Sequence, residues 1–425
     1  MSDFAGKVPG GDVDSVKGET VHMAAALDAP LDLPRLPVLG WHNFIGARHG
    51  DWPSVVDAPH CRYVRSGRVA ILLALRALGI GRGDRVLVPT YHCPTMIAPV
   101  VATGAEPVFF PIDAHGAPIL AALSVQDMKN TRAILAAHYF GLPRGFAPVR
   151  AFCDSHGIAF IEDCAHALFG SAEGRPVGAW GDYAIASLTK FLPVNEGGCL
   201  TSSLRAVDER PSPPRPLLDQ IKVAANAFEQ GAAHGNFRVI GPLIAAMFRA
   251  WHFRHPSQAS APVASSGINF GGNAALRWLD DLHRIPADGF AATLFCRWMA
   301  VHADRERIAR VRRRNYSRLL QLLVSVPGAR PLHAALPPRA APYTFPLFVE
   351  EPERHYQLVR SAGVPIFRWD EIWPSTPRVA GDSGHVWSSH VFQIGCHQDL
   401  SLEAIDMIAA AVRRVLERPG TRLHA

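Results

Sequence analysis

The chain has 425 residues, 48% of them hydrophobic, which is enough apolar surface for one large domain and a smaller one. Its 43 basic and 37 acidic residues give a net charge of +6, a modest excess that would suit anionic small-molecule ligands. The longest apolar run, residues 239–248, is shorter than the ~20 residues of a membrane-spanning helix, and the first 20 residues lack the apolar core of a secretory signal. The 7 cysteines form no Cys-x-x-Cys pair. These features predict a reduced, cytoplasmic protein without stable membrane insertion.

The N-terminal part of the chain predicts an arm followed by a helix. Residues 1–50 have scattered Pro, Gly and Asp, so we expect a partly ordered arm of the kind that often lies across a partner subunit. A helix is predicted from about Ser66 to Gly79, where Gly would stop it. Ser66 and Gly67 would present a hydroxyl and free N–H groups at the positive end of the helix dipole, which suits a phosphate. Ser66 could equally be an ordinary helix cap.

Strands and helices then alternate along the chain. Apolar strands separated by helices at this spacing predict an α/β fold with a mainly parallel sheet covered by helices on both faces. Ligands in such sheets bind at the carboxyl ends of the strands, where Tyr91, His138, Asp163 and Lys190 all lie. The predicted elements are strands at 85–89, 107–112, 133–139, 159–163, 183–188 and 199–202, and helices at about 120–128 and 148–156.

Two of these strand-end residues suggest chemistry. A partly desolvated lysine at position 190 would hold its amine neutral, as an attack on a carbonyl requires, although a solvated lysine beside a strand is the simpler alternative. Asp163 follows an apolar strand, where a buried carboxylate needs a cationic partner such as a protonated heteroaromatic nitrogen. The alternative for Asp163 is a helix N-cap.

Six blocks in order resemble the DegT/StrS-type aminotransferases, which are fold type I enzymes that use pyridoxal 5'-phosphate to aminate keto sugars on nucleotide carriers. The resemblance covers about residues 60–203 and resumes at 343–349 and 395–401. It implies a large domain with a mainly parallel seven-stranded sheet and a smaller C-terminal α+β domain. The six blocks are Ser66–Arg68, Val88–Cys93, Ala137–Pro143, Ile161–Ala167, Gly174–Asp182, and Ser187–Lys190 with the Glu196–Gly198 turn.

The resemblance also implies roles for individual residues. Lys190 would be the catalytic residue that bonds to the cofactor and moves the substrate proton, and Asp163 would keep the pyridine nitrogen protonated. Ser66, the backbone at Gly67 and Arg68, and Ser187 would hold the phosphate. His166 corresponds to the residue near the phenolic oxygen of the ring. His138 would lie near the cofactor or serve only in packing.

The sequence departs from the family pattern at four places. Arg68 replaces a usual Thr, and Phe191 replaces a common Asn after the lysine. Cys93 occupies the position of the aromatic residue that stacks on the cofactor, so Tyr91 or His92 next to it would take that place, or stacking would be lost. The fourth departure, the connection at about 205–286, is longer than usual. It predicts two helices, Leu217–Gln230 and Ile240–Phe253, which we interpret as a lid or a dimer contact in preference to a membrane-surface helix.

The C-terminal part predicts the smaller domain. We place the arm at 1–50, the large cofactor-binding domain at 51–288 and the small domain at 289–425. A helix is predicted at 290–323, strands at 343–349 and 364–368, and a final helix at 401–416 capped by Ser401. Within the helix predicted at 290–323, the segment Arg305–Arg318 is rich in arginine, which we interpret as a solvated face or a subunit contact in preference to a nucleic-acid site.

The sequence therefore predicts a homodimeric aminotransferase with an active site shared between subunits. Glutamate would be the amino donor and a nucleotide-linked keto sugar the acceptor, with no nucleic-acid partner and no metal. Two alternatives stay open: a pyridoxal-phosphate enzyme of specialised metabolism acting on a non-sugar ketone, and a non-catalytic regulator that keeps the fold. Because Lys190 and Asp163 are both present, the regulator is the less favoured of the two.

Overall fold

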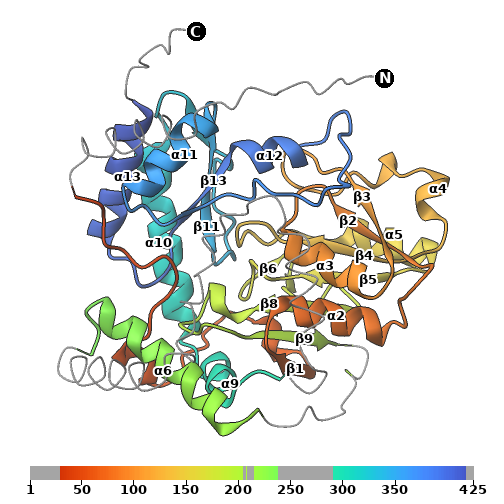
Figure 1. The fold of residues 1–425 in the computed structure, drawn as a ribbon, viewed down its shortest axis with the longest axis horizontal. Helices are drawn as coiled ribbons and strands as arrows, with labels where there is room; N and C mark the ends of the chain where they lie inside the picture. Colours follow the sequence, from red (N-terminus) through yellow and green to blue (C-terminus); the bar gives the residue numbers. More distant parts are fainter. Residues whose placement is uncertain (1–28, 204–206, 208–214, 238–290, 418–425) are drawn as a thin grey trace, which may run out of the picture.

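The computed structural model describes residues 29–203, 207, 215–237 and 291–417 (Figure 1). These residues contain a seven-stranded sheet with the strand order β1-β9-β8-β5-β4-β2-β3. Neighbouring strands are parallel from β3 to β8, whereas β9 is antiparallel to both β8 and β1. The predicted mainly parallel seven-stranded sheet is thus confirmed. Its strands are β1 (His60–Val64), β2 (Arg85–Pro89), β3 (Glu106–Phe110), β4 (Thr131–Ala137), β5 (Ala159–Asp163), β8 (Tyr183–Ser187) and β9 (Gly198–Ser202).

Helices pack on this sheet where the apolar periodicity predicts them. Helix α2 (Gly67–Ala77) packs against β8 and β9, α3 (Pro94–Ala102) packs against α2 and β3, and α5 (Ala147–His156) packs against β5. The Ser66 hydroxyl caps α2 by accepting a hydrogen bond from the Val69 N–H at 3.4 Å. Gly79 follows the C-terminal end of α2 with a φ of 66°, a left-handed conformation that favours glycine and stops the helix. Both ends of the helix therefore follow from its sequence.

A second, smaller sheet is built from the C-terminal part of the chain. In the described residues it has four antiparallel strands in the order β10-β11-β13-β12, and α10, α11 and α13 pack around it. Figure 1 shows this blue and teal part beside the orange and yellow strands of the large sheet. Its elements are α10 (Arg305–Leu323), β10 (Ala329–Pro331), β11 (Thr344–Val349), α11 (Pro352–Ser361), β12 (Ile366–Phe367), α12 (Gly384–His390), β13 (Val391–Gly395) and α13 (Leu402–Leu416).

Two predicted helices are interrupted. The helix expected at 120–128 is a 3-10 turn η3 (Leu120–Ala122) followed by the single turn α4 (Val125–Met128), because Ser124 caps a new start. The helix expected at 290–323 is wrong as one unit, since α9 (Leu294–Val301) ends before α10 begins. Asp304 causes the break, because its side chain accepts the Arg307 N–H at 2.9 Å and caps α10.

The arginine-rich helix α10 is solvated on one face only, where Arg310 and Arg314 are exposed, whereas other arginines of the helix are buried. Arg305 is 3% exposed and its guanidinium pairs with both Asp57 carboxylate oxygens at 2.6 Å. Arg312 is fully buried and donates to the carbonyl oxygens of Pro342 at 2.9 Å and Lys190 at 2.8 Å. The interpretation as a solvated surface is therefore wrong for these residues. The buried arginines of this helix connect the two sheets through hydrogen bonds. Because their guanidinium groups are already engaged, they do not support a nucleic-acid role.

Shorter elements complete the described chain. The segment after residue 28 packs against the small C-terminal sheet of the same chain. The Leu31 N–H donates to Ala362 O and Arg35 donates to Ile366 O, both at 2.9 Å. Helix α6 (Leu217–Ala233) confirms the first helix predicted in the long connection, whereas the second predicted helix, 240–253, lies outside the described residues. The remaining elements are η1 (Trp41–Phe44), η2 (Val55–Asp57), β6 (Ser171–Ala172), β7 (Arg175–Pro176) and η4 (Leu188–Lys190). No described helix has both the length and the apolar character needed to cross a membrane.

Candidate active site

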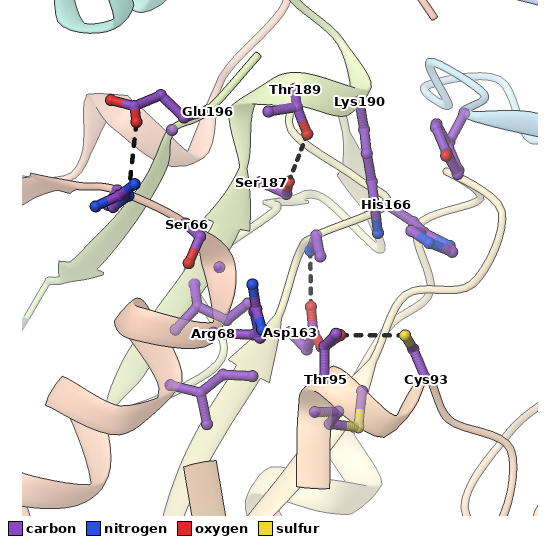
Figure 2. Close-up of a pocket in the computed structure, with 18 of the residues that line it drawn as sticks. Ser66, Arg68, Cys93, Thr95, Asp163, His166, Ser187, Thr189, Lys190 and Glu196 are labelled. Atoms are coloured by element: carbon purple, nitrogen blue, oxygen red, sulfur yellow. Dashed lines mark hydrogen bonds and ion pairs between the residues drawn. The ribbon is translucent and has the colours of Figure 1, made fainter. Parts of the chain in front are cut away.

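One cavity of about 550 Å³ lies where the two sheets meet. Its floor is the edge formed by the carboxyl ends of β4, β5 and β8, and the N-terminus of α2 closes one side. Helix α6 and the small sheet supply the remaining walls. Figure 2 shows labelled side chains from the start of α2, the end of β5 and the end of β8 facing the same space. The cavity is therefore at the edge where parallel α/β sheets bind their ligands.

Lys190 enters this cavity from the short turn η4 directly after β8. Arg312 holds this turn in place by donating to the Lys190 carbonyl oxygen at 2.8 Å. The ammonium nitrogen lies 5.3 Å from the ring centroid of Tyr343. Burial lowers the pKa of Lys190, although the Asp163 carboxylate opposes this shift. The lysine is thus held on rigid backbone, and its pKa is lower than that of a solvated lysine.

Asp163 faces the same cavity from the end of β5. Its side chain is almost completely buried, and one carboxylate oxygen accepts the Ala165 N–H at 2.7 Å. Burial raises the pKa of Asp163, while this hydrogen bond and the charge of Lys190 act in the opposite direction. A buried carboxylate with a raised pKa is stabilised by any cation that enters the cavity beside it.

His166 offers an unused hydrogen-bond donor. Its Nδ1 accepts the Phe140 N–H at 3.3 Å, so the proton of the neutral ring belongs on Nε2. That nitrogen is buried without a partner among the described residues. Burial and the charge of Lys190 hold the pKa of His166 well below its ordinary value. The rings of Tyr343 and Trp369, at 4.6 and 4.8 Å, fix the imidazole in place. His166 therefore presents a neutral Nε2–H donor to the cavity.

His138 also reaches the cavity wall, but both of its ring nitrogens are engaged. Nε2 lies 2.9 Å from Glu162 Oε1 and Nδ1 accepts the Arg144 N–H at 3.2 Å. Glu162 additionally accepts three backbone N–H groups, from Gly178, Trp180 and Gly181. Burial alone would raise the pKa of Glu162, yet His138 and these backbone donors hold it low. His138 and Glu162 therefore fasten the loop beside β5, and their committed atoms argue against a metal site with the neighbouring Cys164.

The residues expected to hold a phosphate gather at one end of the cavity. Ser66, Gly67, Arg68 and Ser187 all line it, at the N-terminus of α2 and the end of β8. Figure 2 shows Ser66, Arg68 and Ser187 on the side of the cavity away from His166. Ser187 Oγ lies 3.2 Å from the Thr189 hydroxyl, a neighbour that the sequence reasoning missed. Hydroxyls, a cation and a helix N-terminus together make an anion seat.

Of the three residues considered for stacking on the cofactor, the structure brings only Cys93 into the described cavity wall. The Thr95 hydroxyl donates to the Cys93 thiol sulfur at 3.1 Å. Tyr91 is buried among other aromatic rings outside the wall. His92 is also buried, with Nδ1 donating to Pro89 O and Nε2 accepting the Trp373 N–H, both at 2.8 Å. Tyr91 and His92 are thus placed as packing residues.

Two groups of lining residues were not found from the sequence. Arg215, Asp219, Lys222, Val223 and Asn226 come from α6 and the residues before it, and Arg215 pairs with Glu196 of the Glu-Gly-Gly turn. Tyr343, Tyr356, Phe367, Arg368, Trp369 and Gln393 come from the C-terminal part of the chain. Tyr343 begins the block 343–349 of the family resemblance but was given no role in the site, and the other residues belong to no block, because they reach the cavity through contacts between distant parts of the chain.

Comparisons with known proteins agree with this geometry. Residues 53–210 match the DegT/DnrJ/EryC1/StrS aminotransferase family. A GDP-perosamine synthase of Vibrio cholerae is 36% identical over 175 residues, which cover 39% of this chain and 47% of that protein. A UDP-N-acetyl-3-dehydro-alpha-D-glucosamine 3-aminotransferase of Acidithiobacillus ferrooxidans is 40% identical over 129 residues, covering 30% of this chain and 34% of that protein. The chain thus matches less than half the length of these curated relatives.

A solved structure extends the likeness to the whole fold. Helicobacter pylori PseC, an aminotransferase involved in the biosynthesis of pseudoaminic acid, superposes with a TM-score of 0.58 at 14% identity. The superposition covers 98% of this chain and 100% of PseC. The fold type I α/β architecture is therefore shared along the chain, including the small C-terminal sheet.

Proposed function

Because the chain carries a DegT/DnrJ/EryC1/StrS aminotransferase family domain, we propose that it is a pyridoxal-phosphate-dependent aminotransferase acting on a keto sugar. The observation that carries this proposal is the convergence of Lys190, Asp163 and His166 on one cavity. Each of the three is buried in a state that a pyridoxal ring would satisfy: a lysine with a lowered pKa, a carboxylate with a raised pKa, and a donor without a partner among the described residues. A regulator that merely kept the fold would have no need of this arrangement.

The residues present fit pyridoxal 5'-phosphate. Lys190 would bind its aldehyde, and the Asp163 carboxylate would pair with its pyridinium nitrogen. The His166 Nε2–H would donate to its phenolic oxygen. The phosphate would be held by Ser66, Ser187, Arg68 and the free N–H groups at the start of α2. When bound, this cofactor supplies an electron sink that stabilises negative charge on the substrate carbon.

The protein's own residues would control the proton transfers. The lowered pKa of Lys190 lets its Nζ accept a proton from the substrate carbon and return it. Asp163 would keep a proton on the ring nitrogen of the bound cofactor, because burial makes an unpaired carboxylate there costly. His166 stays neutral and can donate without adding a charge beside Lys190. Arg312 fixes the backbone from which Lys190 swings.

The substrates follow from the relatives. The curated relatives are named for amino-sugar synthesis on GDP and UDP carriers, so we propose a nucleotide-linked keto sugar as acceptor. Glutamate is the proposed donor. A non-sugar ketone of specialised metabolism is the second candidate, because Cys93 and the long connection after Ser202 depart from the family pattern. All seven cysteines lie in described segments and are free, which supports a reducing compartment such as the cytoplasm.

We also propose a homodimer whose active site is shared between subunits. Support comes from apolar side chains left exposed on two helices that pack together, α6 and α9. Leu218 of α6 is 76% exposed and Leu294 of α9 is 68% exposed. Exposed apolar residues of this size side by side are typical of protein interfaces. Helix α6 also lines the cavity, so a partner bound there would lie close to the substrate.

Spectroscopy of the purified protein tests the proposal. We expect the protein with added pyridoxal phosphate to show a visible absorbance band that decreases on addition of glutamate and returns on addition of a suitable keto sugar. Lys190→Ala should abolish the band. Lys129→Ala, a lysine outside the cavity lining, serves as the matched control and should leave the band unchanged. A wild-type protein that takes up no cofactor would exclude the aminotransferase and favour the regulator.

A further inference from the structure

The small sheet contributes one continuous wall of the cavity. Gln393 of β13 is the register partner of Phe367 of β12, so both side chains point to the same face of this sheet. The neighbouring register pair, Ile366 and Ile394, consists of buried core residues on the opposite face. Trp369 follows Phe367 and lines the cavity with it. The alternation of the strands therefore places Gln393 and Phe367 on the cavity side of the sheet, and Trp369 extends this wall beyond the end of β12.

Gln393 has a polar atom in this wall that no described residue satisfies. Its side chain is 1% exposed, and its amide nitrogen lies 3.2 Å from the Tyr91 hydroxyl. Its amide oxygen is buried and has no partner among the described residues. If the amide were turned over, the Tyr91 hydroxyl would donate to the oxygen and the nitrogen would be left instead. In either orientation one polar atom of Gln393 remains for a ligand, and leaving it unsatisfied is costly.

Trp369 presents an aromatic face next to this glutamine. Its ring centroid lies 4.8 Å from that of His166 and 5.0 Å from that of Tyr91, so the indole is wedged between two buried rings. The Ser388 hydroxyl donates to the Trp369 carbonyl oxygen and holds the backbone. An indole fixed in this way is a preformed surface for the apolar C–H face of a ring, and its placement costs the ligand little ordering.

The charges divide the cavity into two ends. At the small-sheet wall Arg368 is bonded to Glu353 and Asp370, both at 2.8 Å, so its charge is balanced. At the opposite wall the three basic side chains of Arg65, Arg215 and Lys222 outnumber the two acidic ones, Glu196 and Asp219, which both pair with Arg215. The small-sheet end is thus suited to an uncharged ring, and the α6 end to the charged carrier of the same molecule.

We propose that Trp369 and Gln393 form the subsite for the acceptor's sugar ring, with the ring stacked on Trp369 and one of its hydroxyls hydrogen-bonded to Gln393. This inference rests on the proposed function and specifies its substrate as an uncharged, hydroxylated six-membered ring whose anionic carrier points toward α6. The amino donor, which carries carboxylates, would not depend on these two residues. The two residues therefore select the acceptor and not the donor.

Binding measurements on the cofactor-loaded protein in its amino form test this subsite. The probes are UDP-N-acetylglucosamine, dTDP-glucose and GDP-mannose, which are unreactive because they lack the ketone, each compared by calorimetry with its nucleoside diphosphate. We expect at least one sugar-bearing probe to bind roughly fivefold or more tightly than its nucleoside diphosphate. Gln393→Met and Trp369→Leu should each remove most of that gain without changing binding of the nucleoside diphosphate.

Tyr91→Phe is the matched control for Gln393→Met. It removes the internal hydrogen bond to Gln393 but leaves the cavity wall unchanged, so the gain in affinity should persist. The reaction with glutamate, followed by absorbance, should proceed in the wild-type protein and in Tyr91→Phe. The subsite is refuted if no probe binds better than its nucleoside diphosphate, or if the gain survives in both cavity variants. In that event a normal glutamate reaction would leave the aminotransferase proposal standing, whereas a wild-type protein inert to glutamate would remove both.

Discussion

Burial acts on Lys190 and Asp163 in opposite directions, and both shifts favour the same chemistry. Desolvation penalises the charged form of each group, so the pKa of the lysine falls and that of the carboxyl rises. Their mutual attraction limits both shifts. A ligand that neutralises Asp163 and takes up the Lys190 amine would relieve both desolvation penalties at once.

The lowered pKa of Lys190 predicts how cofactor capture depends on pH. The neutral amine is the reactive form, so the capture rate should rise with pH and level off below 10.5, the ordinary lysine value. Asp163→Asn removes the carboxylate that favours the ammonium form, so in this variant the plateau should begin at still lower pH. Stopped-flow absorbance after mixing cofactor-free protein with pyridoxal phosphate measures this profile. A midpoint at the ordinary lysine value would contradict the assigned burial.

Asp163→Asn should also separate binding from turnover. The amide cannot hold a proton on the ring nitrogen by charge, so we expect kcat to fall roughly 10- to 100-fold, as for loss of one charge-assisted hydrogen bond. Lys190 can still bind the aldehyde, and the visible band should remain. Steady-state kinetics and cofactor absorbance on the same preparation give both values. An unchanged kcat would remove Asp163 from the mechanism.

At the scale of elements, α10 links the small sheet to the turn that carries Lys190. Arg312 donates to Gln398 Oε1 at 2.7 Å and to the Lys190 carbonyl at 2.8 Å, and its guanidinium lies 4.4 Å above the Phe191 ring. These bonds connect three segments that are far apart in sequence. The position of Lys190 therefore depends on Arg312, which belongs to a helix that packs against the small sheet.

Replacing this arginine should cost stability. Arg312→Met leaves buried carbonyl oxygens without donors, and we expect a loss of about 2–4 kcal/mol in the free energy of unfolding. Arg310→Met on the same helix is the control, because Arg310 is exposed and should change stability by less than about 0.5 kcal/mol. Urea denaturation of both variants compares them. Equal midpoints would show that α10 does not anchor the catalytic turn.

Local sequence signals predicted the large sheet well, and the small-sheet wall not at all. The apolar strand ending at Asp163 and the Ser66 cap of α2 are local patterns, and both lie where the sequence placed them. Gln393 joins the site through a contact with Tyr91 that is 302 residues away in sequence. A periodic pattern carries no information about such a pairing. The exclusion of Tyr91 and His92 from the cavity likewise depends on tertiary packing.

For the whole molecule, the exposed apolar surface of α6 and α9 predicts a dimer. Light scattering should give twice the chain mass of 46.2 kDa. Leu218→Asp, which places a charge in this surface, should shift the protein toward the monomer. Val125→Asp is the control, since Val125 is 93% exposed on α4 and does not line the cavity. A monomeric wild-type protein, or a Leu218→Asp variant that stays dimeric, would remove α6 as the interface.

The whole account depends on a covalent bond between Lys190 and the cofactor. Reduction of the cofactor-loaded protein with borohydride, followed by peptide mass spectrometry, locates that bond directly. We predict the pyridoxyl-phosphate mass on the peptide that contains Lys190 and, within the limits of detection, on no other lysine. A label on a different lysine, or no label in a protein that has taken up the cofactor, would contradict the assignment of this cavity as the active site.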